Sequence, residues 1–361
     1  MSPFCQTYYS FRNFLRPLLC ASKPQRENLC LLAFGLFAVG NAQLTRIAAK
    51  LPLPINVASA VQRLERLVKN HGVDPAVAFA PVARFVLSRF AGGRIRLILD
   101  ATQVHGRVYL LFVAAAYRGR ALPLAWTAIA QRNGTTSFAE QKRLLDRVAA
   151  LVPQNAEVVL LGDREYGTVA LINYCFERNW RFCLRSKGGR KLTSIDGLER
   201  SACARAHDAG FSPGGRCFLT NLSLPKLGTQ QVNLACSWSQ KSQDYDPWFI
   251  LTDLPADAYV LALYRTRFHI EEMFRDFKEF GFRLEQTRIK LPERVSRLLV
   301  GICTAYIWLL STGVWLSKRG QRKKIDRRPK RQLSYFRIGL RYLQQSLTRD
   351  VSLPKKILIY T

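Results

Sequence analysis

Two carboxylates lie in positions where they could act together on a metal ion. Asp100 closes the apolar run LILD, and Asp163 closes the apolar run VVLLGD. A carboxylate at the end of a strand in an open α/β sheet faces the crevice where ligands bind. A helix cap or a turn is the alternative for either residue alone. Because acids are scarce in this chain and Mg²⁺ prefers carboxylate oxygens, the pair favours a divalent-metal site, with Glu165 as a further candidate ligand.

A third acid belongs to a predicted helix over 258–280. At about 100° per residue, several charged side chains and a tyrosine share one stripe beside the apolar face of this helix. Ordinary solvated ion pairs four residues apart would give a similar pattern. An acid on a helix that follows two strand-end acids favours a catalytic site instead. The stripe consists of Tyr264, Arg267, Glu271 and Lys278, with Arg275 at its edge.

The elements that position these acids alternate between strands and helices. A mixed α/β sheet is therefore predicted. Residues 186–247, rich in Gly, Ser, Lys and Asn, are expected to form a β-rich insertion before a buried strand at 248–252. The other predicted strands are 96–99, 108–117, 120–128, 157–162 and 180–185, and the helices between them are 137–151 and 168–178. The predicted domains are 1–90 (helical), 91–185 (first part of the core), 186–247 (insertion), 248–290 (second part of the core) and 291–361 (helical and basic).

The charge of the chain points to a polyanionic partner. The 361 residues carry a formal net charge of +30, which in a large globular protein is typical of nucleic-acid binding. Residues 1–90 contain eleven Lys and Arg against three acids and could form a helical packing domain or a domain that binds DNA ends. Residues 318–331 contain nine basic residues in fourteen, which favours salt-dependent DNA binding over a solubilising tail.

Cysteine usage and hydropathy bear on the compartment. The nine cysteines form no C-x-x-C pair, so we expect reduced thiols and a cytoplasmic protein rather than a zinc cluster or a disulfide framework. Residues 295–316 are long enough to span a membrane, but they contain Arg297 and several hydroxyl side chains. A buried helix, and no membrane partner, is the expectation.

The helix stripe also resembles a known motif. Tyr264-x2-Arg267-x3-Glu271-x6-Lys278 is the full YREK signature and resembles the DDE transposases of bacterial insertion sequences, specifically the insertion-sequence-four family. Asp100-x-Thr102 and Asp163-Arg164 resemble the other two blocks of that family. The resemblance covers about residues 30–316. It implies an RNase H-like catalytic core with a β-rich insertion, a helical N-terminal domain for DNA recognition and a helical C-terminal region for dimer contacts.

The same resemblance implies a mechanism. Asp100, Asp163 and Glu271 would hold two Mg²⁺ ions, with Mn²⁺ able to substitute. Water would hydrolyse the DNA at the ends of the transposable element and free a 3′-OH, which would then be joined to target DNA. In related members this 3′-OH first attacks the opposite strand and forms a hairpin. Trp248 lies where the family often has a base-stacking Trp, although a core Trp is the alternative. The other implied DNA contacts are Tyr264, Arg267, Lys278, Arg164, Lys187 and Arg275.

The resemblance also implies partners. They are the terminal inverted repeats, target DNA and a second copy of the chain on paired ends. Two other functions stay open. One is a nuclease that cuts without strand transfer, and the other is an inactive or domesticated DNA-binding protein of the same fold.

Overall fold

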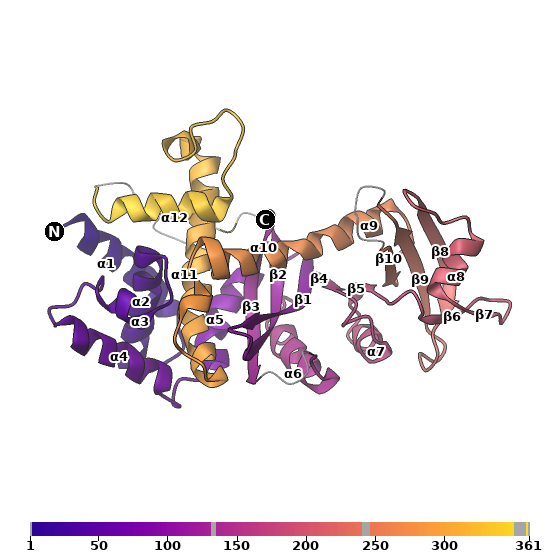
Figure 1. The fold of residues 1–361 in the computed structure, drawn as a ribbon, viewed down its shortest axis with the longest axis horizontal. Helices are drawn as coiled ribbons and strands as arrows, with labels where there is room; N and C mark the ends of the chain where they lie inside the picture. Colours follow the sequence, from indigo (N-terminus) through magenta and orange to yellow (C-terminus); the bar gives the residue numbers. More distant parts are fainter. Residues whose placement is uncertain (1, 131–134, 240–245, 350–358, 360–361) are drawn as a thin grey trace.

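One mixed sheet extends through the middle of the protein (Figure 1). The computed structural model describes residues 2–130, 135–239, 246–349 and 359. Within them the strands are β1 (Arg94–Val104), β2 (Val108–Tyr117), β3 (Arg120–Ala130), β4 (Glu157–Gly162), β5 (Arg181–Arg185), β6 (Lys191–Thr193), β7 (Glu199–Ser201), β8 (Arg216–Ser223), β9 (Gln231–Ser237) and β10 (Trp248–Thr252). Their order is β3-β2-β1-β4-β5-β10-β9-β8-β6-β7.

The centre of the sheet is parallel and its flanks are antiparallel. β1, β4 and β5 run parallel, whereas β2 and β3 form a meander on β1. The strands predicted at 108–117 and 248–252 have those bounds. Strands β8 and β9 of the predicted insertion join the same sheet because β9 pairs with β10. The predicted mixed α/β fold is confirmed.

Strand β1 is longer than the sequence pattern indicated. Its parallel pairing with β4 ends at Leu99 and Gly162, but its antiparallel pairing with β2 continues to Val104. The chain then turns at His105, whose φ is 55°, and a following glycine. Asp100 therefore lies inside a strand, not at its end as predicted. It is the first residue of β1 beyond the ladder with β4.

Helices cover the sheet and fill one end of the protein (Figure 1). Those of the N-terminal region lie beside the two C-terminal helices, away from strands β6 to β9. Those before the sheet are α1 (Pro3–Leu15), α2 (Lys23–Val39), α3 (Leu44–Ala48), α4 (Val57–Lys69) and α5 (Pro75–Ser88). The rest are α6 (Phe138–Ala149), α7 (Val169–Glu177), α8 (Ala202–Asp208), α9 (Ala258–Arg265), α10 (His269–Arg275), α11 (Pro292–Lys318) and α12 (Tyr335–Ser346).

Helix α11 is the buried helix that the sequence predicted. Its length and composition would suffice to cross a membrane, yet its most apolar stretch is entirely buried within the protein. It packs against α2, α5, α12 and β3. Two glycines allow α11 and α12 to approach closely, since an added Cβ on Gly313 or Gly339 would lie 1.8 Å from a carbonyl oxygen of the other helix. Arg297 donates to the carbonyl oxygens of Val68 and Val73.

The predicted continuous helix over 258–280 is interrupted twice. A 3₁₀ turn over 266–268 separates α9 from α10, and a π turn over 276–280 follows α10. Thr266 Oγ1 donates to the carbonyl oxygen of Leu263 at 2.7 Å, a side-chain bond of the kind that competes with helical pairing. In the π turn, Asp276 bonds to Arg120 of β3 at 2.7 Å. Side-chain hydrogen bonds thus accompany both breaks, within the helical segment at the first and to the sheet at the second.

Candidate active site

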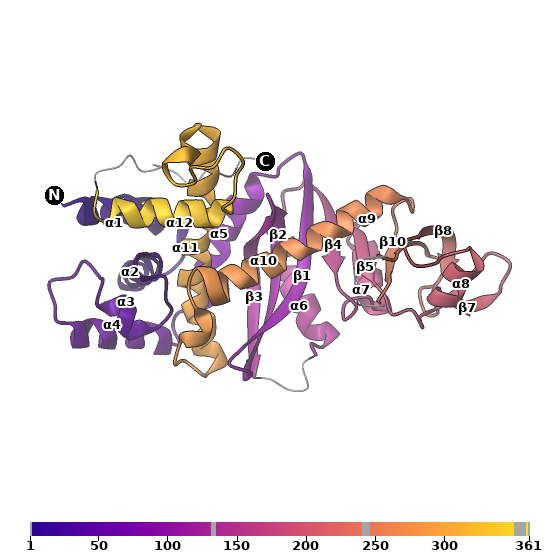
Figure 2. The ribbon, with the colours of Figure 1, turned by 45° about the horizontal axis from the view of Figure 1, so that its top comes forward.

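The three predicted metal ligands come from the centre of the sheet and the helix that crosses it. Asp100 lies in β1, Asp163 directly follows β4, and Glu271 lies in α10. Helix α10 packs against β1, β2 and β3, and Figure 2 shows it crossing these strands. The fold therefore carries all three acids toward one region, although they are 63 and 108 residues apart along the chain.

The three acids interact electrostatically. Burial raises the pKa of Asp100, as do the negative charges of Asp163 and Glu271, and the resulting pKa is about 7. The positive charge of Arg267 and a hydrogen bond from the Ala101 amide oppose this rise. Such coupling of carboxylates in one place is typical of catalytic or metal sites.

Arg267 forms the central link of this site. Its Nη1 donates to Asp100 Oδ2 at 2.9 Å, and its Nη2 donates to Glu271 Oε1 at 2.5 Å. The residue is 7% exposed, while the Glu271 side chain is half exposed. The second oxygen of Asp100 accepts from the Ala101 amide at 2.8 Å. The predicted DNA contact of Arg267 stays a prediction, and the residue has carboxylate partners in this arrangement.

The loop after Asp163 is held in place by Glu165, which the sequence offered as a further candidate metal ligand. Asp163 Oδ1 accepts from the Glu165 amide at 2.9 Å. Glu165 Oε1 accepts from both the amide and the hydroxyl of Thr136, and its Oε2 accepts from Tyr109. Both oxygens of Glu165 thus brace the loop. Sequence reasoning missed Tyr109 and Thr136, which only the folded sheet brings to this loop.

An aromatic cluster lies beside Arg267. Trp248 packs edge-on against Tyr264 at 5.0 Å between ring centroids and stacks on Phe268 at 5.7 Å. Tyr264 is buried, and burial raises its pKa to about 12. The Arg267 guanidinium carbon lies 4.4 Å from the centroid of the Phe268 ring. Phe268 was missed, although its position four residues after Tyr264 on the helix could have indicated it.

The remaining predicted DNA contacts mostly have acidic partners. Arg164 pairs with Asp246 at 3.1 Å, as Arg185 does at 2.7 Å. Arg275 pairs with Glu272 at 2.8 Å, and Lys278 pairs with Glu285 at 3.4 Å. Lys187 is exposed and lines a groove of about 580 Å³ together with Arg190, Lys191 and Lys226. Their predicted roles stay predictions.

Carboxylates are suitable ligands for a divalent metal ion, but in this structure the three acids are not arranged closely enough to share one. Carboxylate oxygens are the ligands that Mg²⁺ prefers. Across the described parts of the chain, however, no three Asp, Glu, His or Cys side chains are gathered closely enough to hold a metal ion. The guanidinium of Arg267 lies on Asp100 and Glu271 instead. All three acids could share an ion only if this guanidinium moved.

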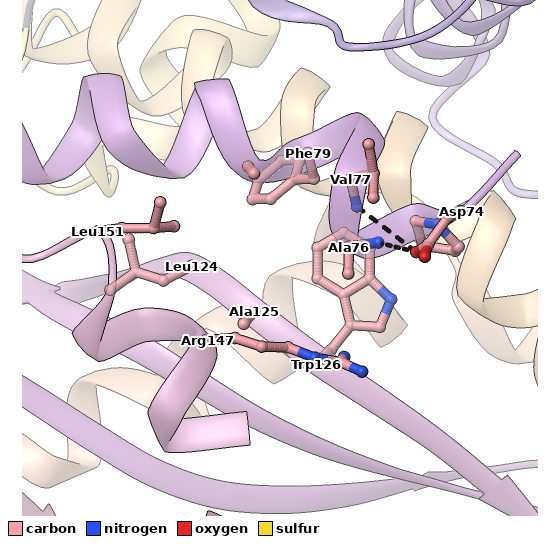
Figure 3. A pocket seen from close by; sticks show the side chains of 11 residues that line it. Asp74, Ala76, Val77, Phe79, Leu124, Ala125, Trp126, Arg147 and Leu151 are labelled. Carbon is pink, nitrogen blue, oxygen red and sulfur yellow. Dashed lines mark hydrogen bonds between the residues drawn. The ribbon is translucent and has the colours of Figure 1, made fainter. Parts of the chain in front are cut away.

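A separate cavity lies between α5, β3 and the end of α6 (Figure 3). Its volume is about 350 Å³ and its lining is mainly apolar. Asp74 there accepts from the amides of Ala76 and Val77 as the N-cap of α5. Trp126 donates to Ser296 Oγ at 3.0 Å. These polar groups stabilise the fold, so this cavity is a weaker candidate than the acids.

Comparisons with known proteins identify the family of this chain. A family model described as "Transposase DDE domain" matches residues 92–308. None of the curated proteins matches the chain. Among the solved structures that match is the cryo-EM structure of the piggyBac transposase synaptic complex with hairpin DNA. It is 10% identical, with a TM-score of 0.46, and the match covers 96% of this chain and 80% of that chain. Because the family model spans more than half of its residues, this chain belongs to the family of transposases with a DDE domain.

Proposed function

We propose that this transposase is of the insertion-sequence-four type and cuts DNA with Asp100, Asp163 and Glu271 as ligands of two Mg²⁺ ions. The observation that carries the proposal is that Asp100 and Glu271 bind the same guanidinium, that of Arg267, at 2.9 and 2.5 Å, while Asp163 directly follows β4, the parallel neighbour of β1. The YREK spacing over 264–278 supports the assignment of Glu271.

The chain's own residues position the reacting groups. Bound divalent ions would supply activation of water and stabilisation of the leaving oxygen. Hydrolysis breaks the bond between phosphorus and the 3′ oxygen at the element's end and frees a 3′-OH. That hydroxyl then attacks a phosphodiester, either in target DNA or first in the opposite strand to form a hairpin. The new P–O bond replaces the bond from phosphorus to the 3′ oxygen of the attacked strand, which leaves as a 3′-OH. A protein nucleophile is unnecessary, and Tyr264 is buried against Trp248.

DNA binding is proposed to use several surfaces. The half-buried Trp248 would stack on an unpaired base, as aromatic side chains do in single-strand binding sites. Lys187 would contact phosphates directly. Arg164, Lys278 and Arg275 would contact them once released from their acidic partners. Residues 1–90 would recognise the terminal inverted repeats, and the C-terminal region would make the dimer. We propose that the protein acts in the cytoplasm without a membrane partner.

Cleavage of an end fragment tests this proposal. Purified protein would be incubated in Mg²⁺ with labelled DNA that carries the inverted repeat flanking its gene. The Asp100→Asn variant keeps the shape of the side chain, and Asp196→Asn, which changes an exposed acid, is the matched control. We expect cleavage at the repeat boundary by the wild type and the control alone.

Two other outcomes of this assay would support the alternatives. Binding without cleavage in any divalent metal would indicate an inactive DNA-binding protein. Cleavage without preference for the repeat boundary would indicate a general nuclease.

A further inference from the structure

We propose that Arg267 is a latch on the metal site, which a DNA phosphate must draw away before divalent ions bind tightly. The inference rests on the proposed function of the three acids. It adds that DNA controls when the metal site forms, so that the protein alone binds the metal weakly.

The contacts of Arg267 compete directly with metal coordination. Its two terminal nitrogens bond to one oxygen of Asp100 and one oxygen of Glu271. The other oxygen of Asp100 accepts from the Ala101 amide, so both of its oxygens have partners. A guanidinium cannot share these oxygens with a dication without strong repulsion, because like charges at contact distance repel. The ion pairs therefore hold the acids in an arrangement that does not favour the metal.

The position of Arg267 suits it to move. It lies in the 3₁₀ turn between α9 and α10, where the regular helix is interrupted. Its Nε is buried and has no hydrogen-bond partner among the described residues, so its present bonding is incomplete. A phosphate can accept two charge-assisted hydrogen bonds from a guanidinium, as many as Arg267 donates to Asp100 and Glu271. An incoming DNA phosphate could thus replace two ion pairs and leave Asp100 and Glu271 free for the metal.

The alternative is that Arg267 only positions the two acids. In that case its side chain would hold Asp100 near Glu271 and would favour metal binding. The two roles predict opposite effects of removing the guanidinium. A latch variant binds metal more tightly without DNA, whereas a variant that lacks a positioning residue binds it more weakly.

The test is a titration of the full chain with Mn²⁺, followed by the electron paramagnetic resonance signal of the free ion. Each protein is titrated alone and with a pre-cleaved end duplex that lacks the terminal 3′-OH. We expect the duplex to tighten Mn²⁺ binding by the wild type about tenfold, the factor that corresponds to an interaction of one pKa unit, about 1.36 kcal/mol. Arg267→Gln should bind about tenfold more tightly without duplex, and Arg265→Gln, which changes an exposed neighbour, should behave as the wild type.

Controls distinguish failure of the latch proposal from failure of the proposed metal site. Asp100→Asn with duplex measures Mn²⁺ held by the DNA itself. The comparison of wild type with and without duplex needs no variant, so it stands even if Arg267→Gln fails to fold. Equal affinity with and without duplex, or weaker binding by Arg267→Gln, would overturn the latch alone. Wild-type binding no stronger than that of Asp100→Asn in both conditions would overturn the proposed metal site as well.

Discussion

Removal of Arg120 should lower the free energy of unfolding, because the buried carboxylate of Asp276 would lose its counterion. The Asp276 side chain is 0% exposed, and its Oδ2 accepts from Arg120 Nε at 2.7 Å. Its Oδ1 has no partner among the described residues. Arg120 also pairs with Glu272 at 3.0 Å. In Arg120→Met, Asp276 would be a buried charge without its counterion, which costs about 3–5 kcal/mol of unfolding free energy near pH 7.

The pH dependence follows from the pKa of Asp276. Burial raises this pKa from 3.8 to about 6, although Arg120 opposes the rise. The native state therefore binds more protons than the unfolded state between these values. The unfolding free energy then falls as pH rises through this window, by about 3 kcal/mol in all. Without Arg120 the pKa rises further, so the loss extends to higher pH. The deficit of the variant should accordingly shrink between pH 7 and pH 5.

Urea unfolding followed by tryptophan fluorescence measures both effects. The control is Arg200→Met, which breaks an exposed pair with Asp208 and should cost less than about 1 kcal/mol. The double variant Arg120→Met/Asp276→Asn should recover most of the stability, because it removes the buried charge as well. A deficit that is equal at pH 7 and pH 5, or no recovery in the double variant, would refute this reasoning.

Several other outcomes are expected. Gly339→Ala should lower the melting temperature strongly, since its Cβ would lie 1.8 Å from the carbonyl oxygen of Leu309; an unchanged melting temperature would contradict this helix contact. Gly167→Ala should reduce end cleavage, because its Cβ would lie 2.1 Å from the carbonyl oxygen of Arg185 and displace the loop after β4; intact cleavage would show that the loop adjusts. Trp248→Ala should weaken binding of single-stranded DNA by about 1–3 kcal/mol in fluorescence anisotropy, and unchanged binding would argue for a core role. The logarithm of the DNA-binding constant should fall linearly with the logarithm of salt concentration, as the net charge of +30 leads us to expect, and a flat dependence would exclude a phosphate-dominated surface.

The apolar pattern of a single strand predicted its bounds well where turn residues flank the strand on both sides. The apolar runs at 108–117 and 248–252 have the predicted bounds, because a run that begins and ends at turn residues needs little else to define it. The extent of β1 was not predictable in this way. Its apolar run ends at Asp100, but β2 continues to pair with β1 to Val104, through the polar residues Thr102 and Gln103. Pairing between strands, rather than the pattern within one strand, decides such ends.

The charged stripe of the helix shows a second limit. An ideal helix over 258–280 brings Arg267 and Glu271 together at a spacing of four, and that pair is present at 2.5 Å. Two partners from the sheet, Asp100 and Arg120, lie 167 and 156 residues away from the side chains that they bind. They bond to residues at or beside the two breaks in the helix, and no periodicity within 258–280 contains that information. A motif of this kind therefore indicates which residues meet, while the side chains of the sheet determine whether Arg267 faces a phosphate or the acids beside it.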